Sequence, residues 1–304
     1  MESLLRPFLF LSLSLVFGVA ASQACTLRPD YNPKTPVLLL PKSKPSSWEQ
    51  ESFFSGLLVQ ILERTREEYG PCEIAFTPEM VTRMRSVALI NQNHSLDLLW
   101  GSTTLERDTL LKAIPVPLLK GLMGYRVLLI RPQDQARFSV VKSLEDLQEL
   151  RAGQGADWPD TSILMTNGIR VVTSINYEAL YRMLAGGRFD FLPRGANQVL
   201  SELRHNAGID IVVEKELVLI YPAPHYFFVD RENTRLAERI SKGLHSMIDD
   251  GSFDRYFYSH PLIREALTEL RLHERRPIYL QNPLLPEGAP MAPPDYWLKV
   301  PHHQ

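Results

Sequence analysis

The residues best suited to binding chemistry lie in the segment 95–126. A short apolar strand, residues 96–100, runs into a Gly-Ser-Thr-Thr turn that contains Ser102 and Thr104, and Arg107 follows within one helical turn. Serine and threonine are good N-cap residues, so a helix that begins here points its first backbone N–H groups at an anion. The arginine adds a permanently charged fork that suits a carboxylate. The segment therefore predicts one wall of an anion-binding cleft.

Length and charge narrow the class of protein. The chain has 304 residues, enough for one large or two modest domains with their own cores. Its 33 basic and 35 acidic residues give a formal net charge of -2, and no basic face stands out. This balance argues against nucleic acid as a partner.

The sequence carries no motif of covalent or metal-assisted catalysis. The eight histidines are scattered without H-x-x-x-H spacing, and the two cysteines do not form C-x-x-C. There is no G-x-S-x-G and no glycine-rich phosphate loop. We therefore expect no metal and no cofactor, and a binding protein rather than an enzyme.

The first 24 residues have the pattern of a secretory signal peptide. Arg6 supplies a positive start, residues 7–21 are almost unbroken apolar, and Ser22-Gln23-Ala24 offers small residues at a cleavage site. The alternative is an N-terminal membrane anchor, but the apolar run is shorter than the ~20 residues needed to span a bilayer. We expect cleavage and an exported, soluble mature chain.

Cys25 would then be the first mature residue, and Cys72 is the other cysteine of the chain. In an oxidising compartment the pair would form a disulfide that contributes ~3 to 4 kcal/mol by restricting the unfolded chain. The alternative is a lipid on Cys25, as in bacterial lipoproteins. The residues before Cys25 lack the aliphatic residue usual three positions upstream, so we favour the disulfide.

The periodicity of apolar residues predicts alternating strands and helices. Strands at 37–41, 72–76 and 96–100 enclose a helix over 48–69 and a helix begun by Thr77-Pro78-Glu79. This order argues for a parallel sheet covered by helices on both faces. The pattern restarts with a strand at 125–131, and the later predictions are a helix over 143–151 with the capping box Ser143/Asp146, strands at 169–173, 189–192, 217–221 and 226–229, helices over 176–185, 232–249 and 261–271, and an irregular proline-rich tail beyond Arg276.

Four short motifs follow one another along the chain. They are Ser102-Thr103-Thr104-Leu105-Glu106-Arg107, Ser143-Leu144-Glu145-Asp146-Leu147, Gly187-Arg188-Phe189-Asp190-Phe191 and Asp250-Gly251-Ser252. Over about residues 35–270 the chain thereby resembles the bacterial extracellular solute-binding proteins of family 3, which show T-x-T-x-E-R, S-L-x-D-L, G-R-x-D-A and D-G-[ST] in the same order.

The resemblance implies a two-lobed α/β fold of the type 2 periplasmic-binding-protein class. Each lobe would be a mainly parallel sheet flanked by helices, and a hinge of two crossings near 118–126 and 217–225 would join the lobes. The implied division is a signal peptide (1–24), a first lobe in two parts (25–120 and 222–271), a second lobe (121–221) and a proline-rich tail (272–304).

The resemblance also implies roles for individual residues. In the amino-acid receptors of the family, the positions of Arg107 and Ser102 bind the ligand's α-carboxylate. The aspartate that binds the α-ammonium falls at Gly195 here, with Arg194 beside it. An ammonium group taken out of water needs a compensating anion. We therefore predict that the ligand is not an ordinary α-amino acid.

One hypothesis is that Arg107 and Arg194 both face the cleft and bind an anion such as a dicarboxylate, between Trp100 and Trp158 as flat apolar walls. Asp157 could replace the missing ammonium partner. Each has a plainer alternative: Arg107 paired with a neighbouring acid on a solvated helix face, Trp158 packed in the core of the second lobe, and Asp157 on an exposed loop.

The predicted function is that of an exported, periplasmic, monomeric solute-binding protein. It would capture a small carboxylate-bearing ligand between its lobes for a membrane transporter or a sensor. Two alternatives remain: an interaction or sensory module that has lost its ligand, and a dehydratase acting on a cyclic carboxylic acid, an activity known for a few members of this fold.

Overall fold

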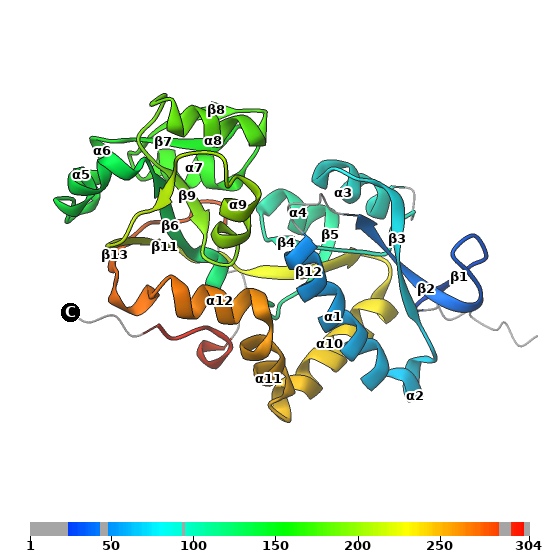
Figure 1. The fold of residues 1–304 in the computed structure, drawn as a ribbon. Helices are drawn as coiled ribbons and strands as arrows, with labels where there is room; N and C mark the ends of the chain where they lie inside the picture. The colour runs from blue at the N-terminus through cyan, green and yellow to red at the C-terminus, as the bar shows by residue number, and fades with distance from the viewer. Residues whose placement is uncertain (1–23, 43–47, 93–94, 286–292, 301–304) are drawn as a thin grey trace, which may run out of the picture.

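The computed structural model describes residues 24–42, 48–92, 95–285 and 293–300. The signal peptide predicted at 1–24 falls outside these residues except for Ala24. Figure 1 shows two lobes side by side, one built from the early strands β1 to β5 and one from β6 to β9. Within the described residues, no helix is both long and apolar enough to cross a membrane.

The first lobe contains two small sheets, ordered β1-β2-β3 and β4-β12-β5. The backbone N–H of Asp97, just before β4, donates to the carbonyl of Leu39 in β2 at 3.0 Å and so links them. Helices α1 and α10 pack against each other over this lobe (Figure 1). The elements are β1 (Thr26–Arg28), β2 (Asn32–Lys42), α1 (Trp48–Arg64), α2 (Arg66–Tyr69), β3 (Glu73–Met80), α3 (Arg83–Asn91), β4 (Leu98–Ser102), α4 (Leu105–Leu110), β5 (Leu111–Ile114), β12 (His225–Asp230) and α10 (Thr234–Asp249).

The second lobe is built on a sheet ordered β10-β6-β11-β13, with β9 also paired to β6, and on the pair β7-β8. Two further helices, α11 (Ser252–Ser259) and α12 (Pro261–Glu269), follow α10. The elements of the second lobe are β6 (Tyr125–Ile130), α5 (Gln135–Ser139), α6 (Leu144–Gln148), β7 (Arg151–Gly155), α7 (Pro159–Thr166), β8 (Arg170–Ser174), α8 (Tyr177–Ala185), β9 (Leu192–Gly195), α9 (Val199–His205), β10 (Val212–Val213), β11 (Leu217–Ile220) and β13 (Arg276–Tyr279).

The sheets are mixed, whereas the sequence predicted mainly parallel ones. The pairs β2/β3, β7/β8 and β11/β13 are parallel. Strand β12 runs antiparallel to both β4 and β5. Its first residue, His225, lies opposite Ser102, the last residue of β4. The chain re-enters the first lobe beside the C-terminal end of β4. Strand β12 therefore runs antiparallel to β4.

Two element predictions were wrong. Strand β3 continues through Thr77, where a helix was expected, because the Thr77 hydroxyl accepts from the Lys42 N–H of β2 at 3.0 Å and so extends the pairing. Helix α3 begins instead after Thr82, whose side chain caps it. The strand predicted at 189–192 is displaced to β9, because the Asp190 carboxylate accepts the Arg151 N–H at 2.8 Å and fixes the chain in a bend.

The capping box predicted at residues 143–146 is confirmed. The Ser143 hydroxyl accepts from the Asp146 N–H at 3.3 Å, and the Asp146 carboxylate accepts from the Ser143 N–H at 3.1 Å. Helix α6 is shorter than predicted, since it ends at Gln148 and the chain then enters β7. Local cap chemistry therefore determined where this helix begins, and the neighbouring sheet determined where it ends.

The disulfide between Cys25 and Cys72 is confirmed, and it ties the segment before β1 to the start of β3. A lipid on Cys25 needs the same sulfur, so the lipoprotein alternative is incompatible with this bond. Beside it, the fully buried Arg239 of α10 donates to the Cys25 sulfur at 3.5 Å and to the carbonyls of Leu62 and Gly70 at 3.0 and 2.9 Å. The disulfide thus forms part of a packed junction between α1, α2 and α10.

The tail predicted to be irregular contains a strand. Residues Arg276–Tyr279 form β13, which adds to the edge of β11 in parallel, from Leu217 opposite Arg276 to Ile220 opposite Tyr279. Ile278 is buried in the core at 4% exposure. The edge of β11 thereby gains a partner, and β13 becomes the edge strand of this sheet.

Candidate functional site

A small pocket lies where the two lobes meet. The first lobe contributes Ser102 and Thr103 at the end of β4, and the second contributes Arg126, Asp160 and Tyr221. Its cavity volume is about 10 Å³, roughly the space of one water molecule. The remaining lining residues are Pro159, Ile163, Ala223, Pro224, Asn282 and Leu284.

Three side chains form a closed polar cluster on the second-lobe side of this pocket. The Arg126 guanidinium lies 2.7 Å from the Asp160 carboxylate and donates to the Tyr221 hydroxyl at 2.7 Å. The Tyr221 hydroxyl in turn donates to Asp160. Burial raises the pKa of Tyr221, so its hydroxyl stays protonated and keeps its donor role.

Sequence reasoning missed this cluster, although one signal for it was present. Pro159 stands at the first position of α7 and Asp160 at the next. Proline at N1 and an acidic residue in the first turn are typical of a helix start, and they place Asp160 at the end of a helix that faces the other lobe.

The helix start predicted beside Arg107 is confirmed. Helix α4 begins after Thr104, whose hydroxyl accepts from the Arg107 N–H at 3.2 Å. The Arg107 side chain turns back from α4 toward the end of β4, where it donates to the Ser102 carbonyl. It lies over the Phe228 ring, 5.3 Å from its centroid. It is 8% exposed. A Cβ at Gly101 would come within 2.8 Å of the guanidinium, so any side chain there would displace Arg107 from its present position.

Arg194 lies in a different setting from the one expected. Its guanidinium forms two hydrogen bonds to the Glu202 carboxylate, at 2.5 and 2.7 Å, and stacks over the Trp158 ring at 4.4 Å. Both charged side chains are buried. Burial on its own would raise the pKa of Glu202, but the Arg194 charge more than offsets this and holds that pKa below its usual 4.5. The pairing neutralises Arg194, so a ligand bound by two unpaired arginines is not supported.

The aromatic side chains divide between the lobes. Trp100 stacks on Phe54 with ring centroids 5.1 Å apart and planes 25° apart, and Phe54 stacks in turn on His225. Trp158 lies between Arg194 and Tyr177 within the second lobe, as its plainer alternative predicted. Trp100 therefore packs within the first lobe, and Trp158 packs within the second lobe.

A side chain at position 195 would displace the side chains that pack around Gly195. A Cβ on Gly195 would lie 2.9 Å from Gln198 Oε1, 3.0 Å from Asn197 Oδ1 and 3.1 Å from Arg126 Nη1. Asn197 is 2% exposed, and neither polar atom of its side chain has a hydrogen-bond partner among the described residues. Amide groups thus surround this position. Asp157, the proposed substitute, is exposed.

Polar contacts also join α9 and the residue before it to α1 and α12. The Gln198 amide donates to the Gln50 side chain at 3.4 Å. Arg204 of α9 donates to Glu49 of α1 at 3.1 Å and to Glu265 of α12 at 2.5 Å. These contacts, with the small pocket volume, describe lobes that are drawn together.

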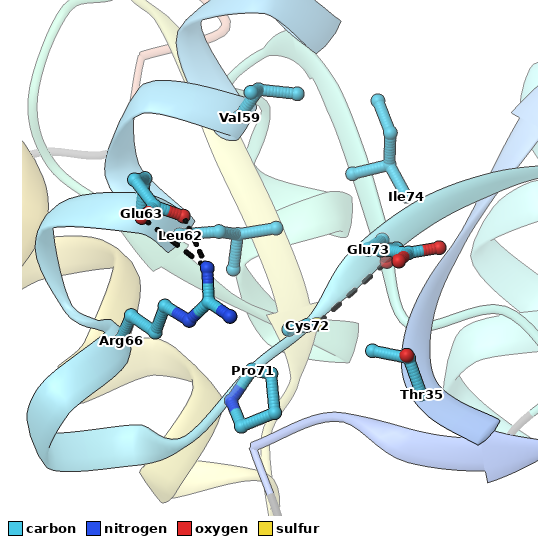
Figure 2. Close-up of a pocket in the computed structure, with 9 residues that line it drawn as sticks. All are labelled: Thr35, Val59, Leu62, Glu63, Arg66, Pro71, Cys72, Glu73 and Ile74. Atoms are coloured by element: carbon cyan, nitrogen blue, oxygen red, sulfur yellow. Dashed lines mark hydrogen bonds and ion pairs between the residues drawn. The ribbon is translucent and has the colours of Figure 1, made fainter.

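A larger pocket of about 440 Å³ lies beside the disulfide, between α1 and β3, and is open to solvent (Figure 2). Its charged side chains already have partners: Arg66 donates to Glu63 at 3.4 Å, and Glu73 accepts from Asn32 at 2.8 Å. Among the described residues, no group of three or more His, Cys, Asp or Glu side chains is placed to hold a metal ion. A further pocket of about 640 Å³ lies against α1, α9 and α12, and there Arg204 is paired with Glu49 and Glu265. We take the interlobe pocket as the candidate site because the predicted Ser102 meets charged side chains of the second lobe there.

Comparison with solved structures identifies the fold. A histidine kinase sensor domain with similarity to periplasmic binding proteins is 17% identical, covers 77% of this chain and 98% of its own, and has a TM-score of 0.55. An ancestral amino-acid-binding protein, a precursor of cyclohexadienyl dehydratase, is 16% identical over 74% of this chain and 95% of its own, with a TM-score of 0.53.

The probable amino-acid ABC transporter extracellular-binding protein of Bacillus subtilis is 14% identical, covers 74% of this chain and 96% of its own, and also has a TM-score of 0.53. No family model and no curated protein matches the chain by sequence. At these identities the likeness shows the fold: a two-lobed, type 2 periplasmic-binding-protein-like architecture.

Proposed function

We propose that this chain is an exported solute-binding protein that holds a small carboxylate-bearing ligand between its lobes and serves a membrane transporter or a sensor. The observation that carries the proposal is the pocket that joins the end of β4 to the start of α7. Ser102 and Thr103 line one side, and the Arg126–Asp160 pair lines the other. Solved structures of this fold include amino-acid-binding proteins, a transporter-binding protein and a sensor domain.

Arg107 is the residue that we assign to the ligand carboxylate. It is anchored at the start of α4 and lies directly beside Ser102, so a rotation of its side chain would carry the guanidinium from the Ser102 carbonyl to a ligand in the pocket. A carboxylate offers the guanidinium two charged acceptors, and such a charge-assisted pair is stronger than a hydrogen bond to a neutral carbonyl.

The rest of the ligand is expected to be neutral. Gly195 stands where an acidic group would bind an ammonium, and the amide oxygens of Asn197 and Gln198 pack beside it. Neutral oxygens compensate a desolvated ammonium less well than a carboxylate does. Hydroxy acids and other carboxylates without an α-ammonium should therefore bind more tightly than amino acids of the same carbon skeleton.

A ligand panel tests this directly. The purified mature protein would be titrated calorimetrically with L-amino acids, the matching L-2-hydroxy acids and dicarboxylates of similar length. We expect binding by at least one carboxylate, and tighter binding of a hydroxy acid than of its amino-acid counterpart. Arg107→Ala should weaken that binding by about 10- to 100-fold, which corresponds to one lost hydrogen-bonded ionic contact.

Arg85→Ala is the matched control, because Arg85 is an exposed arginine on α3 of the same lobe. It should leave the affinity unchanged. Equal affinity of Arg107→Ala and the unaltered protein would remove Arg107 from the site. Tighter binding of an amino acid than of its hydroxy acid would contradict the neutral-ligand expectation, and binding of no panel member would favour the interaction-module alternative.

A further inference from the structure

Two described segments near the C-terminus contact the two chain crossings that join the lobes, near residues 118–126 and 217–225. The crossings touch each other where the Tyr221 N–H donates to the Gly124 carbonyl at 3.2 Å, so closely that a Cβ at Gly124 would fall 2.0 Å from the Tyr221 carbonyl oxygen. Residues 280–285 lie against the second crossing, and residues 293–300 lie against the first. We call these two segments the clasp.

The first arm of the clasp is fixed to the second crossing and to the second lobe. Beyond β13, the Leu280 N–H donates to the Ile220 carbonyl at 2.9 Å, and the Asn282 amide donates to the Pro222 carbonyl at 2.8 Å. Gln281 exchanges two hydrogen bonds with Asn167 at the end of α7, at 2.8 and 2.9 Å. Asn282 also lines the interlobe pocket, so this arm is one of its walls.

The second arm is fixed to the first crossing. The Leu298 N–H donates to the Lys120 carbonyl at 2.7 Å, and the Trp297 ring covers Gly121 so closely that a Cβ there would lie 2.6 Å from the ring. The Tyr125 hydroxyl is hydrogen-bonded to the backbone of Val300. This arm therefore contacts the crossing at Lys120, Gly121 and Tyr125.

The first crossing is the part of the backbone that the second arm constrains most. Lys120 and Gly121 both adopt left-handed conformations, with φ of 48° and 79°. Such a conformation is costly for lysine and is retained when its surroundings determine it. The Lys120 ammonium, buried at 5% exposure, pairs with Asp254 of α11 at 2.7 Å, and its carbonyl is held by the clasp.

We propose that the clasp sets the balance between closed and open lobes. Opening requires changes of φ and ψ at a few residues of the crossings, and the clasp binds the backbone carbonyls of Lys120, Ile220 and Pro222 in both. The closed arrangement is therefore stabilised from within the chain, and a partner that draws the C-terminal segment away would release the lobes. This mechanism does not depend on the identity of any ligand.

The test measures the distance between the lobes without added ligand. Nitroxide labels would be placed at Met84→Cys on α3 and Ile175→Cys in the second lobe, whose side chains are 78% and 95% exposed. The two native cysteines are joined in the disulfide, so labelling is specific. Pulsed electron resonance of Trp297→Ala and of Asn282→Asp should show a longer-distance population, with a ratio of open to closed forms raised about 2- to 10-fold per lost contact.

Tyr279→Ala is the matched control, since it removes a 66% exposed aromatic side chain from β13 outside the clasp. It should leave the distance distribution unchanged. Trp297→Phe keeps a ring over Gly121 and should stay close to the unaltered protein, and circular dichroism would verify that every variant is folded. Distances unchanged in both Trp297→Ala and Asn282→Asp would overturn the proposal. Because no ligand is added, this result is separate from any failure to find one.

Discussion

Glu202→Leu is expected to lower the free energy of unfolding by about 3 to 5 kcal/mol, the cost of leaving one partner of a buried ion pair alone. Arg194 would remain 6% exposed against Trp158 without its carboxylate. The double variant Arg194→Met/Glu202→Leu removes both charges and keeps similar volume, so its loss should be much smaller. Urea denaturation of the two variants side by side measures the difference.

The same pair predicts a pH dependence. The pKa of Glu202 in the folded chain lies below its usual 4.5, since Arg194 favours the charged form despite burial. Its contribution to stability is therefore fully present above pH ~4.5 and is lost as the pH falls through the lower pKa of the folded state. Stability of the double variant should fall less steeply with acid than that of the unaltered protein.

Other carboxylates with lowered pKa values, such as Asp146, Asp190 and Asp250, are present in both proteins, so the comparison isolates the contribution of Glu202. Two outcomes would contradict the assignment: a loss below ~1 kcal/mol in Glu202→Leu, or equal acid sensitivity of the double variant. Either would mean that Arg194 finds water or another acceptor when Glu202 is removed.

The sequence was informative wherever a structural feature depends on neighbouring residues. The Ser143/Asp146 box was predicted with its correct residues, and Thr104 was one of the N-cap candidates in the turn before Arg107. The alternation of strands and helices followed from the periodicity of apolar residues, which burial in a sheet or against one enforces. The two-lobed fold followed from the order of motifs.

Unlike the Cys25–Cys72 disulfide, the contacts between distant residues around the candidate site escaped prediction. Arg194 was expected to face a ligand. Its neighbours in the sequence do not show that Glu202, on the following helix α9, packs back onto it. The Arg126, Asp160 and Tyr221 cluster joins three elements, and no local pattern couples them. Gly195 was noted as a missing acid, but the side chains that fill its space became visible only in three dimensions.

The tail shows the same limit in another form. Its prolines favour irregular structure, yet residues 276–279 pair with β11. An edge strand tolerates proline at a position whose backbone nitrogen faces away from the pairing. The N–H groups of Arg276 and Leu280 donate to the carbonyls of Glu216 and Ile220. The alternation along a strand therefore turns the nitrogen of Pro277 away from β11. The proline content favours irregular structure over the tail as a whole. It does not show that residues 276–279 pair with β11.

Removal of the disulfide is the second large effect that we expect. Cys25 and Cys72 are 47 residues apart in sequence. Opening a loop of that length should cost about 4 kcal/mol in the chain-entropy description. Cys25→Ala/Cys72→Ala is therefore expected to lower the free energy of unfolding by about that amount, measured by denaturation with urea. Arg239 would lose its contact with the Cys25 sulfur but keep its bonds to the carbonyls of Leu62 and Gly70.

Reductant separates the covalent bond from the packing around it. Dithiothreitol should destabilise the unaltered protein by a similar amount and leave the double alanine variant unaffected, because that variant has no bond to reduce. A loss of less than ~1 kcal/mol in both experiments would contradict the chain-entropy account. It would mean that the pairing of β1 and β3 with β2 already holds the two cysteine segments together in the unfolded ensemble.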